Sequence, residues 1–175
     1  ALVKFDTSNN DLGAEGGKAL AEALKDNTFM KELNIANNSL VFNKTDMSGV
    51  IAIRDALPTM ALAKLSMAQN SIATKEAGEA LGQALAKNLV LKELDVSSNN
   101  SGNSWNDGSG FAKGIAAGLG ANGALTSLNI SNNKLATKEA GQALAGALAA
   151  NSTLKELNVS NNYDRDVAND GPGFA

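Results

Sequence analysis

The chain has 175 residues, a formal net charge of −3 and a hydrophobic content of 43%, so it is long enough for one domain with a sizeable core. It contains no His and no Cys, which excludes Ser-His-Asp and Cys-His nucleophiles, Cys/His zinc sites, disulfides and thiol redox centres. Its lysines are scattered and no apolar run reaches the roughly 18–20 residues of a membrane span, so we expect neither nucleic-acid binding nor membrane insertion.

One pattern, apolar-x-x-apolar-x-apolar-x-x-Asn, recurs six times along the chain. The first copy covers residues 2–12, with Thr7 as a weak apolar member, and an Ala/Leu stretch at 19–24 follows it. The later copies cover 30–40, 62–72, 91–101, 125–135 and 154–164, and a similar Ala/Leu stretch lies at 143–148. The leucines of these stretches recur at i, i+4, which is the spacing of one helical face. The sequence therefore predicts a helix between successive copies.

The repeats alternate in length. The copies start at residues 2, 30, 62, 91, 125 and 154, so the intervals are 28, 32, 29, 34 and 29 residues. A shift of 63 residues superposes 62–112 on 125–175 without a gap and maps 73–78 onto the identical 136–141. The unit of duplication is therefore a pair of repeats, one short and one long.

These six copies resemble the leucine-rich-repeat family, and the short repeats are most similar to its ribonuclease-inhibitor-like subfamily. The resemblance covers essentially the whole chain and implies an α/β fold. It would be a right-handed solenoid, or horseshoe, with parallel strands on the concave face and helices on the convex face. We therefore expect a single domain of six repeats over 1–175. Because residues 174–175 match 111–112, which lead into a helix, we also expect the chain to be part of a longer protein.

An asparagine closes the pattern in every repeat. A chain that leaves a strand inside a stack exposes backbone donors and acceptors, so a side chain that both donates and accepts is needed there. We predict that these residues form a buried structural column: Asn10, Asn38, Asn70, Asn99, Asn133 and Asn162.

Two surfaces are candidate partner sites. The long-repeat loops contain the rare aromatics Phe42, Trp105 and Tyr163 and also Arg165, and ordered loops on a rigid scaffold commonly carry function. We predict a binding edge centred on Trp105; the alternative is that the aromatic side chains cover the local core. On the concave face the candidate residues are charged: Lys31, Glu32, Lys92, Glu93, Asp95, Lys155 and Glu156.

No motif in the chain assigns a nucleophile, an acid–base pair, a phosphate loop or a metal site. We therefore predict a non-enzymatic protein-interaction scaffold with a protein partner, no cofactor and no metal, and the absence of Cys favours an intracellular location. One alternative is regulatory, because such repeats also resemble the scaffold of Ran GTPase-activating proteins; it would need a functional arginine and an acidic tail. The other alternative is a structural subunit of a large assembly.

Overall fold

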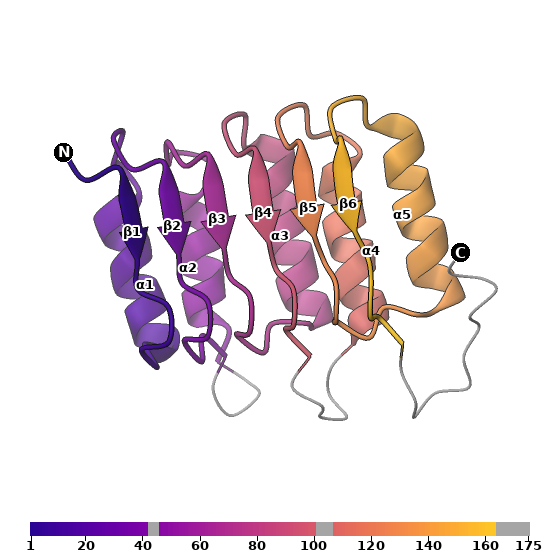
Figure 1. The fold of residues 1–175 in the computed structure, drawn as a ribbon, viewed down its shortest axis with the longest axis horizontal. Helices are drawn as coiled ribbons and strands as arrows, with labels where there is room; N and C mark the ends of the chain where they lie inside the picture. The colour runs from indigo at the N-terminus through magenta and orange to yellow at the C-terminus, as the bar shows by residue number, and fades with distance from the viewer. Residues whose placement is uncertain (42–45, 101–106, 164–175) are drawn as a thin grey trace.

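The computed structural model describes residues 1–41, 46–100 and 107–163, in which a sheet forms one layer and helices form the other (Figure 1). All six strands are three residues long and pair in parallel in the order β1-β2-β3-β4-β5-β6. The strands are β1 (Lys4–Asp6), β2 (Glu32–Asn34), β3 (Lys64–Ser66), β4 (Glu93–Asp95), β5 (Ser127–Asn129) and β6 (Glu156–Asn158). The helices in the described residues are α1 (Gly13–Leu24), α2 (Ser48–Ala56), α3 (Lys75–Lys87), α4 (Gly108–Leu119) and α5 (Lys138–Ala150). The predicted repeat solenoid is confirmed.

The register of the sheet keeps each repeat position in line. Leu33 of β2 pairs with Leu65 of β3, and Leu65 pairs with Leu94 of β4. The same register continues at both ends of the sheet. Equivalent residues of all six repeats therefore form straight columns across the strands.

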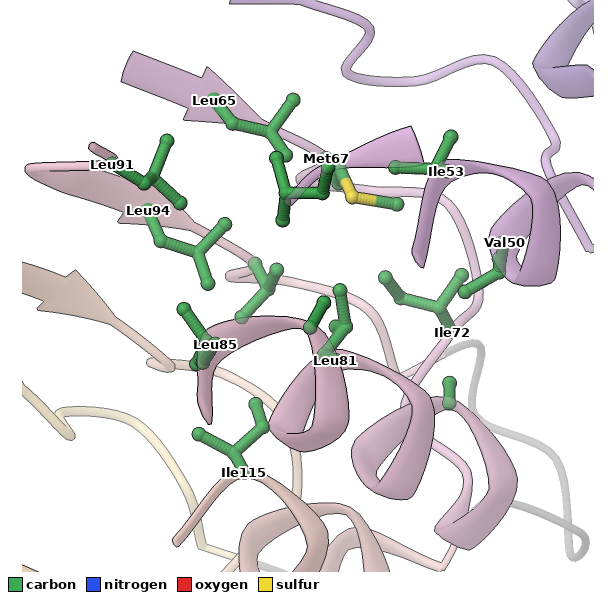
Figure 2. Packing of buried hydrophobic residues seen from close by; sticks show 14 of the residues in the cluster. Val50, Ile53, Leu65, Met67, Ile72, Leu81, Leu85, Leu91, Leu94 and Ile115 are labelled. Carbon is green, nitrogen blue, oxygen red and sulfur yellow. The ribbon is translucent and has the colours of Figure 1, made fainter. Parts of the chain in front are cut away.

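The core lies between the sheet and the helices. Figure 2 shows Leu65 and Met67 on the sheet side and Leu81 and Leu85 of α3 opposite them. Each of these side chains is at least 98% buried, and burying such a side chain contributes about 1.5–3 kcal/mol. Leu148, which lies on the leucine face predicted for the stretch 143–148, is instead 40% exposed, because among the described elements only α4 packs beside α5.

Glycines allow α3 and α4 to pack closely. A Cβ atom on Gly78 would lie 2.4 Å from the carbonyl oxygen of Phe111. A Cβ atom on Gly82 would lie 2.0 Å from the carbonyl oxygen of Gly114. Any side chain at these positions would therefore push the two helices apart.

Side-chain caps fix where three of the helices begin. Thr74 accepts a hydrogen bond from the backbone of Ala77 at the start of α3, and Thr137 accepts one from Ala140 at the start of α5. Asp107 accepts a 2.7 Å bond from the backbone of Gly110 in α4. These caps satisfy helix donors that would otherwise have no partner.

Candidate interaction surfaces

The buried members of the asparagine column have a structural role. Asn38, Asn70, Asn99 and Asn133 are fully buried, whereas Asn10 at the first repeat is exposed. Each buried amide oxygen accepts from the backbone N–H of the preceding column member; Asn70 accepts from Asn38 at 2.9 Å. Each amide nitrogen donates to carbonyls of its own and the preceding repeat. Five of the six asparagines are therefore buried and linked from repeat to repeat, and Asn10 is the exposed one.

A second polar column lies at the opposite ends of the strands, and the sequence analysis missed it. Asn88 accepts from the backbone of Leu91 at 2.7 Å and donates to the carbonyl of Leu57 in the preceding repeat. Asn122 and Asn151 make the same kinds of bond one and two repeats further on. All three stand three residues before the start of a repeat, and that recurrence is the signal that would have revealed them.

The concave face has a shallow hollow of about 290 Å³, lined by residues of β1 to β5. The first residues of the first four strands alternate in charge and pair between repeats. The Lys4 ammonium lies 3.3 Å from the Glu32 carboxylate, and Lys64 lies 2.8 Å from Glu93. The pairing with Glu93 raises the pKa of Lys64. The candidates Glu32 and Glu93 thus lie on this face, but lysines that the sequence analysis did not select neutralise them.

The remaining concave side chains are polar or acidic. The candidate Asp95 is the last residue of β4, and its carboxylate accepts from the backbone of Ser97. At the equivalent place in β1, hydrogen bonds from Ser8 and then Asn34 hold the pKa of the Asp6 carboxyl below its usual range. Lys4 and Lys64 are each paired with a glutamate. Asp6 and Asp95 therefore add negative charge that these two lysines do not balance.

The three candidate lysines do not pair with the glutamates that follow them in sequence. Lys31 and Lys92 are exposed residues just before β2 and β4, and both ammonium groups bond to loop carbonyls, at 3.1 Å to Thr28 and 3.2 Å to Ala124. Lys155 precedes β6 in the same way and is exposed. These lysines therefore belong to the edge where the strands begin, beside the concave face.

The predicted loop edge lies largely outside the described residues. Phe42, Trp105 and Arg165 all lie outside the described residues, so their predicted role stays a prediction. Tyr163 is described and is 64% exposed, so its ring does not cover the local core.

Two other kinds of site were searched for over the same described ranges. No group of three or more acidic, His or Cys side chains that could hold a metal ion occurs within 1–41, 46–100 and 107–163. No helix in those ranges is long and apolar enough to cross a bilayer.

Comparison with known proteins supports the architecture. A family model described as Leucine Rich repeat matches residues 2–21 and 150–162. The C-terminal domain of tropomodulin from Caenorhabditis elegans is similar in structure, with a TM-score of 0.58 and 15% identity over 84% of this chain and 82% of that one. The actin-binding site 2 domain of leiomodin-1 has a TM-score of 0.60 and 19% identity over 83% of this chain and 76% of that one. These identities show the fold alone, and the family match supports the leucine-rich-repeat interpretation at residues 2–21 and 150–162.

Proposed function

We propose that this chain is a non-enzymatic, intracellular protein-interaction scaffold of the ribonuclease-inhibitor-like type, and that it binds a protein partner on its concave face. The observation that supports this function is the hollow lined by β1 to β5, in which polar and charged side chains stand in register on a hydrogen-bonded sheet. Side chains held on a rigid sheet lose little entropy when a partner binds.

The charge of the concave face indicates the chemistry of the partner segment. Asp6, Asp95 and Glu156 carry negative charge that no lysine on this face pairs with among the described residues. Charge complementarity between surfaces speeds association and selects partners. We therefore expect the segment that enters the hollow to carry lysine or arginine.

The loop edge is the second surface in this proposal, with Trp105 at its centre and Phe42, Tyr163 and Arg165 beside it. It is supported by the 64% exposure of Tyr163 and by the concentration of aromatic residues in the long repeats. Interface anchors are commonly Trp, Tyr and Arg. Once a partner is known, Trp105→Ala tests this surface: affinity should fall by about 2 kcal/mol with little change in thermal stability.

No observation in the described residues favours a GTPase activator. Arg54 is engaged by the carboxylate of its neighbour Asp55 at 2.8 Å. The other arginine of the chain, Arg165, lies outside the described residues.

The decisive test blocks the hollow without removing a native bond. Ser66 and Ser127 line the hollow and make no side-chain hydrogen bond, so Ser66→Arg/Ser127→Arg adds bulk and positive charge there. Gln83→Arg/Gln142→Arg is the matched control, because both glutamines are exposed on convex helices. Filamentous actin is the first probe, since the leiomodin-1 domain of the same fold is an actin-binding site.

Co-sedimentation with actin is followed by affinity capture from cell extract, with bound proteins identified by mass spectrometry. We expect at least one protein to bind the wild-type chain and the control variant but not the blocked variant. The proposal fails if every bound protein is retained equally by all three chains.

A further inference from the structure

The edge of the solenoid at which the strands begin carries a second set of exposed groups. It consists of the five loops that lead from the helices into the strands, at 25–31, 57–63, 88–92, 120–126 and 151–155, and these loops lie along the upper edge in Figure 1. We call it the strand-entry edge. It is separate from the hollow of the concave face and from the loop edge of the long repeats.

Large apolar side chains are exposed on this edge without a structural need for them. Phe29 is 60% exposed, Leu89 is 76% exposed and Val90 is 41% exposed. Phe29 and Val90 occupy the same repeat position, at which the other loops have the small residues Ala61, Ala124 and Thr153. Folding therefore does not require a large side chain at this position.

Asn27 stands three residues before the start of the second repeat and so extends the second polar column, and this column holds the apolar side chains in place. Asn27 accepts hydrogen bonds from the backbone of Phe29 at 2.9 Å and of Met30 at 2.7 Å. Asn88 accepts equivalent bonds from Val90 at 2.9 Å and from Leu91. The apolar groups thus stand on ordered loops, and such preorganisation favours binding.

A row of unpaired lysines runs beside the apolar groups. Glu32 and Glu93 face Lys4 and Lys64, so neither neutralises Lys31 or Lys92. Lys155 likewise has no carboxylate partner among the described residues. The five loops contain a single acidic residue, Asp26, so the strand-entry edge is locally basic in a chain with a net charge of −3.

The spacing of these groups matches one kind of partner. Lys31, Lys92 and Lys155 precede alternate strands, and neighbouring strands lie about 4.8 Å apart, so the lysines recur about every 10 Å. A helix rises about 10.5 Å in seven residues. Phe29 and Val90 are also two strands apart.

We propose that the strand-entry edge binds an acidic amphipathic helix of a partner protein, which lies across the strand ends. Lys31, Lys92 and Lys155 would meet acidic residues at heptad spacing, and Phe29, Leu89 and Val90 would contact the apolar side of the helix. A helix is narrow enough to lie on this edge alone. A flat anionic membrane would also approach the carboxylates of the concave face and be repelled by them, so a protein segment fits better.

The test uses a fluorescein-labelled peptide of about 20 residues, which spans about 30 Å as a helix, with Glu at every seventh position and Leu beside it. A second peptide with Lys in place of each Glu is the charge control. Fluorescence anisotropy measures binding to the wild-type chain, and co-sedimentation with phosphatidylserine vesicles tests the membrane alternative.

Lys31→Glu/Lys92→Glu should weaken binding of the acidic peptide at least about tenfold, because two attractive contacts become repulsive. Lys113→Glu/Lys138→Glu changes the net charge equally on exposed convex positions and should leave binding unchanged. Phe29→Ser/Val90→Ser should also weaken binding at least about tenfold, with the circular dichroism melting curve unchanged.

The proposal is overturned if the acidic peptide does not bind, if the two double charge variants bind it equally, or if only the vesicles bind. Ser66→Arg/Ser127→Arg keeps this test separate from that of the proposed function. That variant blocks the concave hollow and should still bind the acidic peptide.

Discussion

Replacement of Asn70 by alanine tests how the repeats are held together. The Asn70 side chain supplies the acceptor for the backbone N–H of Asn38 and a donor to the carbonyl of Ile35, both at 2.9 Å in the buried interior. The Asn70 amide also donates to the carbonyls of Met67 and Ala68, but each of these carbonyls has a second donor in the variant. Met67 also accepts from the Asn99 amide, and Ala68 also accepts from the backbone of Asn37. The variant therefore leaves the N–H of Asn38 and the carbonyl of Ile35 without a partner, and the backbone N–H of Leu40 also loses its longer, 3.3 Å bond to the same amide oxygen.

A buried polar group without a partner costs about 1–3 kcal/mol, so Asn70→Ala should lower the free energy of unfolding by about 2–6 kcal/mol. Domains are commonly stable by about 5–15 kcal/mol, so the loss is large enough to measure. Urea unfolding followed by far-ultraviolet circular dichroism gives the value, and the slope with urea shows whether unfolding stays cooperative.

Asn10→Ala is the matched control within the same column. Asn10 is exposed and water can replace the bonds that its amide makes, so its loss should be below about 1 kcal/mol. Equal effects of the two substitutions would refute the argument that burial determines the contribution of each column member.

Three further predictions follow from named contacts. Asn122→Ala should lower the free energy of unfolding by about 2–4 kcal/mol in urea, because it removes a buried side chain from the second column; a loss below about 0.5 kcal/mol would contradict that role. Gly114→Ala should lower the melting temperature, because its Cβ would lie 2.2 Å from the backbone of α3. Gly146→Ala has open space around its Cβ and should raise the free energy of unfolding by about 0.5–1 kcal/mol. If Gly146→Ala were the destabilising variant of the two, this account of helix packing would be wrong. In an NMR titration Asp6 should show a pKa below its usual range, and Ser8→Ala should raise that pKa only in part, because the variant loses the hydroxyl donor but keeps the backbone N–H of residue 8, which lowers the pKa most. Since the pKa is lowered on folding, this carboxylate adds stability above its unfolded pKa of about 4 and loses that contribution as the pH falls through its folded pKa. An unchanged pKa in the variant would exclude the Ser8 hydroxyl as a cause.

The sequence predicted the fold because its signal is repeated. A single apolar pattern is weak, but six copies in register define the strands, and the asparagine that ends each copy defines the buried column. The exposed Leu148 shows the limit of this reasoning. Periodicity shows which face of a helix is apolar, but burial also depends on the neighbour that packs against that face.

The candidate binding residues were predicted less well, because their environment depends on contacts between repeats. The adjacent pair Lys31 and Glu32 reads as one charge pair in the sequence. In the structure Glu32 faces Lys4 of the preceding strand, and Lys31 turns to the carbonyl of Thr28. Only the strand register reveals this separation. The candidates Phe42 and Trp105 lie outside the described residues, so their role stays a prediction.

The duplicated pair of repeats explains why opposite charges collect on neighbouring surfaces. The 63-residue shift maps Lys92 and Glu93 onto Lys155 and Glu156, so both copies carry a lysine for the strand-entry edge and a glutamate for the concave face. The same shift maps Lys64 onto Ser127, which pairs in register with Glu156 but has no charge. The negative charge of Glu93 is therefore balanced by Lys64, whereas Glu156 has no lysine at the equivalent place. One substitution between the copies thus makes the concave face acidic toward β6 while the edge beside it stays basic, and each surface favours a partner segment of opposite charge.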